Sequence, residues 1–189
     1  MKRNAKKAKT RFTNGDPLCR RNEAEVIREI VETVWNIVCS SLPSYDDNLV
    51  GIESRMVKIN ALLEIEADSI CFVGIWGMGG IGKTTLARLV FERISGQFEI
   101  SCFLANVREI SERKGIVSLQ NDILLHLNKG QKIYDEHCGK TILNRLFRSK
   151  KVLLVVDDAN HVSQLESLAS PKWFGAGSRV IITTRNCTY

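Results

Sequence analysis

From residue 69 onward the hydrophobic pattern alternates between two kinds of segment. Continuous apolar runs of strand length occur at 69–76, 99–107, 151–156 and 178–184. Between them, apolar residues recur at helical spacing in segments that begin near residues 83, 118, 141 and 163, the last with Ser163 and Glu166 as an expected capping box. Apolar runs of this kind are typical of strands buried on both faces. The alternation therefore predicts an α/β fold, in which helices cover both sides of a parallel sheet.

The residues before this region follow a different pattern. Residues 1–21 include the turn-like NGDP at 14–17 and predict an unstructured tail. From Asn22 to about Val38 the apolar residues trace one helical face, and the polar stretch 40–48 ends it. A second helix is expected from about Glu53 to Glu66. We therefore expect a basic disordered tail at 1–21, a helical linker at 22–48 and one folded domain at 49–189.

The tail carries the basic character of the chain, whose formal net charge is +6. Residues 1–21 hold eight Lys or Arg and one Asp, a net charge of +7, so the other residues sum to −1. A solvated tail is the simplest interpretation, with nuclear import or weak nucleic-acid binding as the alternative. No apolar run approaches the roughly 18 residues that span a membrane, and no signal peptide is apparent. We expect a soluble intracellular protein without a membrane partner, cytoplasmic unless the tail directs it to the nucleus.

Cysteine and histidine show no metal-binding or disulfide pattern. The six cysteines form no C-x-x-C, and the three histidines form no H-E-x-x-H. Cys71 and Cys102 fall within apolar runs, where a free cysteine behaves as a small hydrophobe.

The segment GMGGIGKTT at 77–85 satisfies G-x-x-x-x-G-K-[ST] and follows a predicted strand. Its glycines allow positive φ angles and bring backbone N–H groups close to phosphate oxygens. The N-terminus of the next helix attracts the same negative charge. In this motif Lys83 reaches the β- and γ-phosphates, and the hydroxyl of Thr84 ligates Mg²⁺. A glycine-rich turn would explain the glycines but not the Lys-Thr pair, so the motif predicts nucleotide binding.

Asp157 and Asp158 end the apolar run of the third predicted strand. The carboxyl ends of parallel strands form the edge at which open α/β sheets bind ligands. Asp157 is placed to hold Mg²⁺ through its water shell, as a Walker B aspartate does, and Asp158 to orient or deprotonate an attacking water. Two solvated carboxylates at a strand end are the alternative interpretation.

Arg185 follows Thr183 and Thr184 at the end of the fourth predicted strand. Its guanidinium can sense a γ-phosphate there, although an ordinary surface arginine would have the same place in the sequence. The N-K-x-D motif of guanine-specific proteins is absent, because residues 128–131 read NKGQ. Adenine is therefore favoured over guanine.

Together these segments resemble the NB-ARC domain of plant disease-resistance proteins over about residues 22–186. VGIWGMGGIGKTTLA resembles its P-loop, KVLLVVDDAN its kinase-2 strand and WFGAGSRVIITTRN its sensor segment. FLANVREIS and WFGAGSR are similar to the subclass with an N-terminal TIR domain, although Asn160 stands where that subclass usually has Asp. The resemblance implies a P-loop NTPase three-layer sandwich. It also implies an ADP/ATP switch that is at most a weak, Mg²⁺-dependent ATPase.

The resemblance also implies a role for each matching residue. Phosphate contacts would come from Gly77, Met78, Gly79, Gly80, Ile81, Gly82, Lys83, Thr84 and Thr85. Val50 and Gly51 would contact adenine, and Arg185 would sense the γ-phosphate. Asp157 would join Thr84 at Mg²⁺, and Asp158 would be the catalytic candidate.

By the same resemblance the chain would be a fragment, with a sheet that is incomplete at the C-terminus. Full-length relatives continue through helical and winged-helix subdomains and leucine-rich repeats. Their P-loop strand lies between the sensor strand and a later fifth strand. Without the fifth strand the P-loop strand becomes a sheet edge, so we expect a marginally stable chain that self-associates or pairs with receptor partners.

Two other functions stay open at this point. A P-loop small-molecule kinase would need an arginine-rich lid, and the region between the second and third strands offers arginines at 108, 113, 145 and 148 but no clear lid. A non-catalytic interaction module would bind full-length receptors through its open sheet edge or its N-terminal helix.

Overall fold

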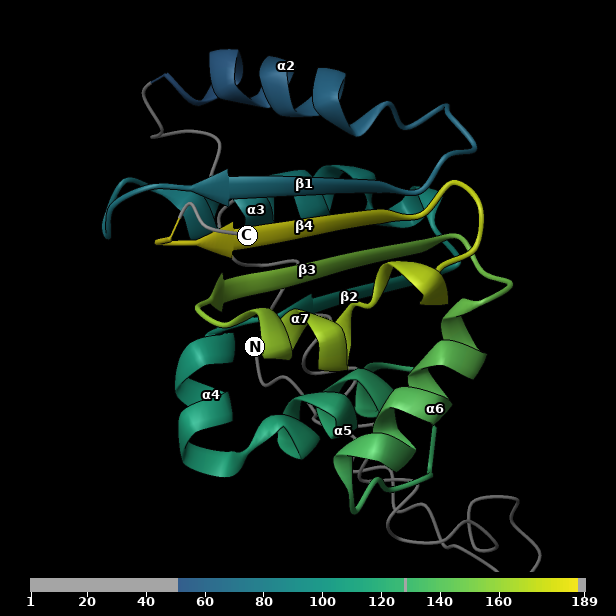
Figure 1. Cartoon of the computed structure of the whole chain (residues 1–189). Helices are drawn as coiled ribbons and strands as arrows, with labels where there is room; N and C mark the ends of the chain where they lie inside the picture. The colour runs from purple at the N-terminus through teal and green to yellow at the C-terminus, as the bar shows by residue number, and fades with distance from the viewer. Residues whose placement is uncertain (1–50, 128, 187–189) are drawn as a thin grey trace, which may run out of the picture. The chain divides into compact units, whose positions relative to one another are not determined.

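The computed structural model describes residues 51–127 and 129–186, and these contain one parallel sheet of four strands. The strand order is β1-β4-β3-β2, with every neighbouring pair parallel (Figure 1). The strands are β1 (Cys71–Trp76), β2 (Ile100–Leu104), β3 (Val152–Ala159) and β4 (Arg179–Thr184). The predicted α/β fold with a parallel sheet is therefore confirmed.

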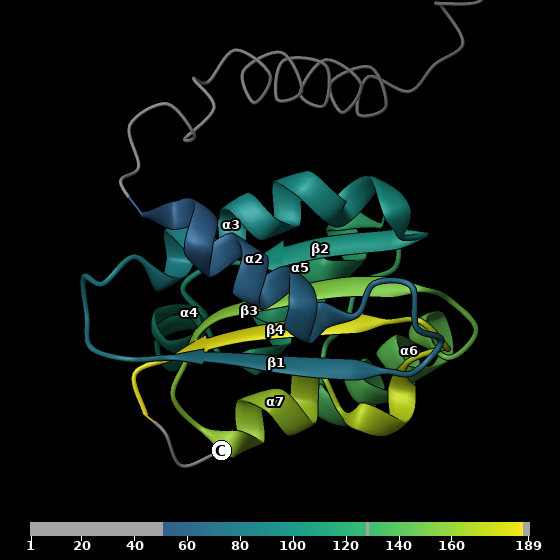
Figure 2. The same ribbon diagram turned by 90° about the horizontal axis from the view of Figure 1, so that it is seen from above.

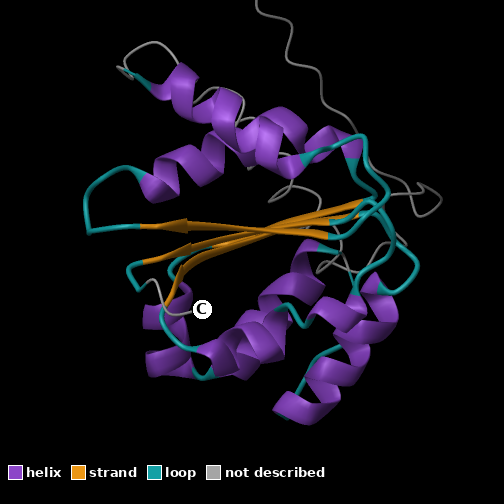
Figure 3. Cartoon of the chain, turned by 45° about the horizontal axis from the view of Figure 1, so that its top comes forward, coloured by secondary structure: helices purple, strands orange, loops and turns teal. Residues whose placement is uncertain are grey.

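Helices cover both faces of this sheet (Figure 3). One face carries α2 (Ile52–Leu63) and α3 (Lys83–Ile94), which lie next to each other when the sheet is seen from above (Figure 2). The other face carries α4 (Val107–Lys114), α5 (Ile116–His126), α6 (Glu136–Phe147) and α7 (Val162–Leu168). Two short 3₁₀ turns, η3 (Ser95–Gln97) and η4 (Pro171–Trp173), precede β2 and β4.

Each face of the sheet has its own apolar core, and β3 contributes to both. Leu153 and Val155 pack with α2 and α3, whereas Leu154 and Val156 pack with the helices of the other face. Successive side chains of a strand point to opposite faces, so a strand between two helical layers needs apolar residues throughout. Burial on both faces is thus confirmed for β3, and β4 is likewise buried along most of its length.

β1 departs from the prediction of burial on both faces. Among the described strands it pairs only with β4, and the side chains of Phe72 and Trp76 are 36% and 66% exposed. Val73 is buried on the α2 and α3 side. On the other side the ring of Phe72 meets the ring of Phe174 edge-on, with centroids 5.8 Å apart. The prediction of burial on both faces is therefore wrong for this strand, although β1 does occupy the edge position expected from the resemblance within the described residues.

Several boundaries differ from those predicted. The strand expected at 99–107 ends at Leu104, and α4 follows as a helix that the sequence analysis missed. Asn106, with φ at 52°, turns the chain between them. The helix expected to reach Glu66 ends at Leu63, because Glu64 adopts a left-handed conformation with φ at 41°. Local backbone conformation, rather than apolar periodicity, sets these ends.

The starts of α6 and α7 are likewise not set by apolar periodicity, but by hydrogen bonds from the backbone to capping side chains. α6 begins at Glu136 instead of 141, because the side chain of Asp135 accepts a hydrogen bond from the backbone N–H of Cys138 at 2.9 Å. The capping box expected from Ser163 and Glu166 is wrong. α7 begins at Val162, and Oε1 of Gln164 accepts from the backbone N–H groups just before it, those of Asn160 at 2.9 Å and His161 at 3.1 Å.

Some predictions lie outside the described residues. The expected tail and linker fall within residues 1–50, as does Val50. Within the described part, no helix is long and apolar enough to cross a membrane. Cys71, Cys102 and Cys138 are free thiols, and burial, with a smaller contribution from Asp122, raises the pKa of Cys102 to about 12.

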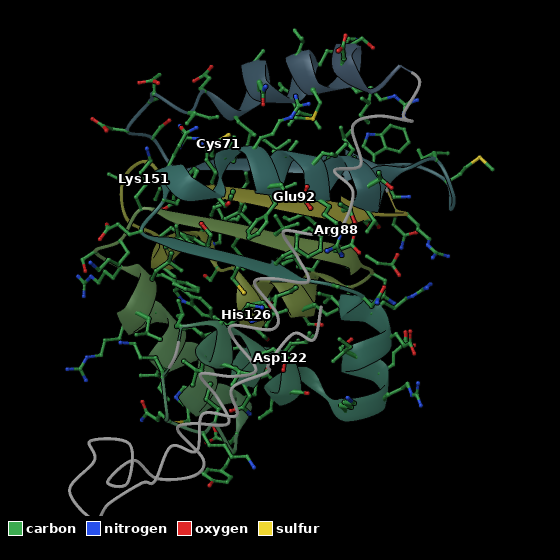
Figure 4. All side chains as sticks on the ribbon, turned by 180° about the vertical axis from the view of Figure 1, so that it is seen from behind. Cys71, Arg88, Glu92, Asp122, His126 and Lys151 are labelled. Carbon is green, nitrogen blue, oxygen red and sulfur yellow. The ribbon has the colours of Figure 1, made fainter. Side chains whose placement is uncertain are left out.

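An arginine side chain covers an aromatic ring of β2. Arg88 of α3 lies over the ring of Phe103, 4.6 Å from its centroid (Figure 4). The same ring meets Phe91 edge-on, with centroids 5.6 Å apart. The guanidinium of Arg88, a partly exposed residue, therefore covers this ring and part of β2.

Candidate functional site

The loop between β1 and α3 forms one wall of the candidate site. Gly82 is the N-cap of α3, with φ at 86°, and Gly80 has φ at 80°. These left-handed conformations strain any residue with a Cβ atom, so the loop requires glycine at both positions. They turn the chain directly into α3, whose N-terminus carries a partial positive charge. An anion-attracting helix end therefore lies beside the loop.

Lys83 binds the loop that precedes it. Its Nζ donates hydrogen bonds to the backbone carbonyls of Gly77 at 2.7 Å and Met78 at 2.8 Å. An ammonium group has three donors, so one remains for an anion in the cavity. The lysine thus holds the start of the loop close to the first turn of α3.

A bulge brings both aspartates of β3 to the same cavity. Val156 pairs with Ile182 and Ala159 with Thr184, so β3 has one more residue than β4 across this interval. Asp158 has φ at 57°, in the left-handed region. In a regular strand two consecutive side chains would face opposite sides, but a bulge re-aims one of them. Asp157 and Asp158 consequently both line the cavity.

Asp157 is the centre of a hydrogen-bond network that joins three elements. It is 1% exposed, and its Oδ1 accepts from Oγ1 of Thr84 at 2.8 Å and from Oγ1 of Thr183 at 2.6 Å. Oγ1 of Thr183 accepts in turn from the backbone N–H of Asp158 at 2.9 Å. The network connects α3, β3 and β4 at the carboxyl ends of the strands.

Two arginines contact Asp158, one on each carboxylate oxygen. Oδ2 lies 3.1 Å from Nη2 of Arg108 in α4, and Oδ1 accepts from Nε of Arg185 at 3.2 Å. The guanidinium of Arg185 extends toward the P-loop, where a Cβ atom added to Gly79 would lie 3.9 Å from Nη1. Arg185 therefore reaches from Asp158 to the loop across the cavity mouth.

These residues enclose a cavity of about 280 Å³. The expected residues that line it are Gly79, Gly80, Gly82, Lys83, Thr84, Thr85, Asp157, Asp158 and Arg185. Four other expected contacts, Gly51, Gly77, Met78 and Ile81, are not among its lining residues. Asn106 and Thr183 line it without having been predicted. The TTR pattern could have indicated Thr183, whereas Asn106 and Arg108 come close only through the packing of α4 against β3.

The oxygen donors of the site fit a magnesium ion. Mg²⁺ prefers hydroxyl, carboxylate, phosphate and water oxygens, and Thr84 and Asp157 supply the first two. No group of three metal-binding His, Cys, Asp or Glu side chains occurs in the described part of the chain. A magnesium ion here would thus depend on phosphate and water oxygens for its other ligands, as is usual for nucleotide-bound Mg²⁺.

A second cavity, of about 270 Å³, lies among the helices of the other face. Its polar groups are already paired with one another. Nε2 of Gln164 donates to Ser111 and Asn160, at 2.7 and 2.8 Å, and Oγ of Ser167 donates to Glu136 at 2.6 Å. This pairing favours the cavity beside the P-loop as the functional site.

Comparison with known families supports the same assignment. The NB-ARC domain family matches residues 52–188. The chain belongs to this family. The resemblance inferred from the motifs is therefore confirmed, and NB-ARC membership implies a nucleotide-binding domain.

The relatives of this NB-ARC chain include plant disease-resistance proteins. It is 42% identical over 175 residues to the TMV resistance protein N of Nicotiana glutinosa, covering 88% of this chain and 15% of that protein. It is 38% identical over 174 residues to the probable disease resistance protein RPP1 of Arabidopsis thaliana, covering 88% and 14%. The chain thus spans about one seventh of the length of these relatives.

Among solved structures, the NB-ARC chain is similar to Cdc6p from Pyrobaculum aerophilum. The TM-score is 0.58 at 18% identity, over 77% of this chain and 42% of that one. At this identity the likeness concerns the fold alone. It agrees with a parallel α/β sheet that carries a P-loop between β1 and α3.

Proposed function

We propose that this NB-ARC domain binds an adenine nucleotide with Mg²⁺ in the cavity beside the P-loop, as the switch of an intracellular plant immune receptor. The observation that carries the proposal is the convergence of Lys83, Asp157 and Arg185 on one cavity. These residues come from α3, β3 and the end of β4. The disease-resistance relatives support the immune role, and the family supports the nucleotide.

The phosphate chain would lie along the P-loop and the N-terminus of α3. Lys83 supplies a positive charge, and Thr85 a second hydroxyl beside Thr84. When bound, Mg²⁺ neutralises charge on the β- and γ-phosphates, and Thr84 and Asp157 are the protein groups placed to hold it. Arg185 offers charge-assisted hydrogen bonds to a γ-phosphate that ADP lacks. The site can thereby distinguish the two nucleotides.

Slow hydrolysis fits the surroundings of Asp158. Both carboxylate oxygens are already engaged, one by Arg108 and one by Arg185. A carboxylate held in this way is poorly placed to accept a proton from water, so Asp158 would orient a water rather than deprotonate it quickly. This arrangement favours a switch that holds its nucleotide over an efficient hydrolase.

The adenine would lie near the start of α2. Nη1 of Arg55 donates to the backbone carbonyl of Ile81 at 3.2 Å, which ties the first turn of α2 to the P-loop. Gly51, the N-cap of α2 with φ at 76°, is exposed just before this turn. Because Arg55 links the first turn of α2 to the P-loop, Gly51 at the start of that helix stays a candidate adenine contact.

Calorimetric titration of the chain with ADP, ATP and GTP in the presence of Mg²⁺ tests the proposal. The wild-type chain is expected to bind ADP and ATP more tightly than GTP, and Lys83→Ala is expected to lose at least about tenfold in affinity because a charge-assisted phosphate contact is removed. Lys58→Ala, an exposed lysine of α2, is the matched control and should bind as the wild type does. Equal affinity for GTP, or unchanged binding by Lys83→Ala, would contradict the proposal.

The edge position of β1 favours one alternative, a non-catalytic module that pairs with receptors through this strand. Phe72 and Trp76 are the exposed apolar side chains that such a partner would cover. This alternative predicts a purified chain without nucleotide whose self-association is the same for wild type and Lys83→Ala. Light scattering of both proteins, together with the titrations above, separates the two functions.

A further inference from the structure

Of the two arginines that contact Asp158, Arg185 lines the cavity and Arg108 does not. Its side chain is 35% exposed and lies behind Asp158, which is 20% exposed. Arg185, on the other carboxylate oxygen, is 52% exposed. The three side chains thus run from α4 through the β3 bulge to the cavity mouth. Arg108 therefore contacts the site through Asp158 and not through the cavity lining.

The contact between Asp158 and Arg185 uses only part of the guanidinium. Asp158 accepts from Nε, and no hydrogen bond or ion pair joins either Nη group to another described residue. A carboxylate with both oxygens available commonly pairs with a guanidinium through two parallel hydrogen bonds. Here the second oxygen is taken by Arg108. The Nη groups of Arg185 therefore stay available to an anion.

Other contacts hold Arg108 in place. It lies in the first turn of α4, directly after the fully buried Val107. Oγ of Ser111 donates to the backbone carbonyl of Arg108 at 2.9 Å, and Nε2 of Gln164 donates to the same hydroxyl at 2.7 Å. These bonds join α4 to α7 and limit the movement of the first turn. These contacts hold the backbone of Arg108, from which its side chain reaches the Asp158 carboxylate.

We propose that Arg108 is a positioning residue for the γ-phosphate contact. It holds one oxygen of Asp158, so that Asp158 pairs with Arg185 through Nε alone and leaves the Nη groups directed toward the P-loop. Without Arg108, Asp158 turns both oxygens to Arg185 and competes with the phosphate for it. Arg108 thereby raises affinity for ATP without raising affinity for ADP. This inference rests on the proposed nucleotide function.

The test compares ATP and ADP affinities of single and double variants of the full chain, by calorimetric titration with Mg²⁺. Arg108→Gln is expected to weaken ATP binding about tenfold and ADP binding less than about twofold, because only the γ-phosphate contact depends on Arg185. Arg185→Gln should have the same selective effect. The double variant should be no weaker than Arg185→Gln, because Arg108 acts through that side chain.

Arg113→Gln provides the matched control. Arg113 belongs to the same helix and pairs with Glu109 at 3.0 Å, but both side chains are well exposed and neither lines the cavity. Its ATP and ADP affinities should equal those of the wild type. Arg108→Lys keeps the positive charge and the aliphatic part of the side chain, so it replaces Arg108→Gln in the titrations if that variant does not fold. It should weaken ATP binding about threefold and leave ADP binding unchanged, since a single ammonium nitrogen replaces the planar guanidinium fork.

The possible failures can be told apart. A folded wild-type chain that binds neither nucleotide overturns the proposed function and this inference together. If the wild type binds both, the inference alone fails when the Arg108 variants weaken ATP and ADP equally. It fails also when they change neither affinity, or when their effect is fully retained in the Arg185→Gln background.

Discussion

Thr183 connects the two carboxylates of the site through a single hydroxyl group. Oγ1 donates to Asp157 at 2.6 Å and accepts from the backbone N–H of Asp158 at 2.9 Å. Thr183→Val keeps the shape of the side chain but leaves the buried carboxylate of Asp157 and the partly buried N–H of Asp158 without that partner. We expect the free energy of unfolding to fall by about 1–3 kcal/mol and Mg²⁺-dependent nucleotide binding to weaken. Urea unfolding and titration measure the two effects.

The next residue of β4 supplies the control for this prediction. Within the described part of the chain, Oγ1 of Thr184 accepts only from the backbone N–H of Asn186, at 3.1 Å. Asn186 is exposed, so water can replace the lost hydroxyl. Thr184→Val should therefore cost less than about 1 kcal/mol and leave Mg²⁺ dependence unchanged. Equal losses in the two variants would show that the network at Asp157 has no special role.

Arg179 is a fully buried arginine at the start of β4 whose described partners are all backbone carbonyls. Its guanidinium donates to the carbonyls of Ser69 at 2.6 Å, Ala67 at 2.8 Å and Ser178 at 2.9 Å, and also to those of Leu63 and Glu64. The last two belong to the C-terminal end of α2, where the helix dipole favours a cation. One side chain thus joins the end of α2 to the sheet.

Removing this guanidinium should be among the most destabilising single changes in the domain. Arg179→Met fills similar space but removes a donor from five carbonyls, of which only those of Glu64 and Ser178 keep a backbone N–H partner among the described residues, so we expect a loss of about 3 kcal/mol or more in the free energy of unfolding. Arg179→Lys keeps the charge with fewer donors and should lie between Met and wild type. Chemical unfolding measures both. A loss below about 1 kcal/mol for Arg179→Met would contradict this account.

At the scale of elements, the contact between α5 and α6 depends on a glycine inside a helix. A Cβ atom at Gly139 would lie 1.9 Å from Oε1 of Gln120, which is fully buried and bonded through Nε2 to the carbonyls of Glu136 and Ser167. Replacing a helical glycine by alanine normally stabilises by about 0.5–1 kcal/mol. For Gly139→Ala the sign should reverse, and the free energy of unfolding should fall by about 1–3 kcal/mol because of overpacking. Thermal unfolding measures this change. The control is Gly96→Ala, because a Cβ atom added there would meet nothing within 4 Å.

The first turn of α6 should make stability depend on pH. Hydrogen bonds from Lys140 and then from Ser167 lower the pKa of Glu136 from its usual value of about 4.5. A lowered pKa in the folded state means that the carboxylate stabilises the fold above pH 4.5, and that this contribution is lost as the pH falls through the lowered pKa. Glu136→Gln should be less stable than wild type at pH 7 by under about 1 kcal/mol, since the pair is partly exposed.

Urea unfolding at several pH values checks this prediction. The difference between wild type and Glu136→Gln should shrink below pH 4.5, because a protonated glutamate and a glutamine then resemble each other. Glu109→Gln, in an exposed pair on α4, shows how much an ordinary surface carboxylate contributes. A difference that stays constant from pH 7 to pH 3 would contradict the role given to the Glu136 carboxylate.

The elements also show which features of the fold follow from apolar pattern. β3 and β4 were predicted well because burial on both faces demands an uninterrupted apolar run. α4 was missed because only Val107 among its residues is buried, so its sequence lacks an apolar stripe. The early start of α6 depends on one cap, Asp135, and not on periodicity. The exposed side chains of β1 follow from its position at the edge of the sheet. That position depends on the order of the strands, which the apolar pattern of a single segment does not reveal.

At the scale of the whole molecule, the site lies where three distant parts of the described chain meet. The P-loop, Asp157 and Arg185 were identifiable because each follows a predicted strand, and parallel strands end at one sheet edge. Asn106 and Arg108 were not identified as site residues, since they reach it through the packing of α4 on β3. Motif spacing therefore predicts the residues of the site that would bind phosphate. The residues that support them, such as Arg108, can be identified only from the tertiary structure.

The central claim is that this domain holds an adenine nucleotide through the P-loop. The most direct measurement is chromatographic identification of nucleotide released when the purified chain is denatured, for wild type and Lys83→Ala. The account predicts ADP or ATP in near-stoichiometric amount from the wild type and little from a folded Lys83→Ala. A folded wild-type chain that releases no adenine nucleotide, or a Lys83→Ala chain that releases as much as the wild type, would contradict it.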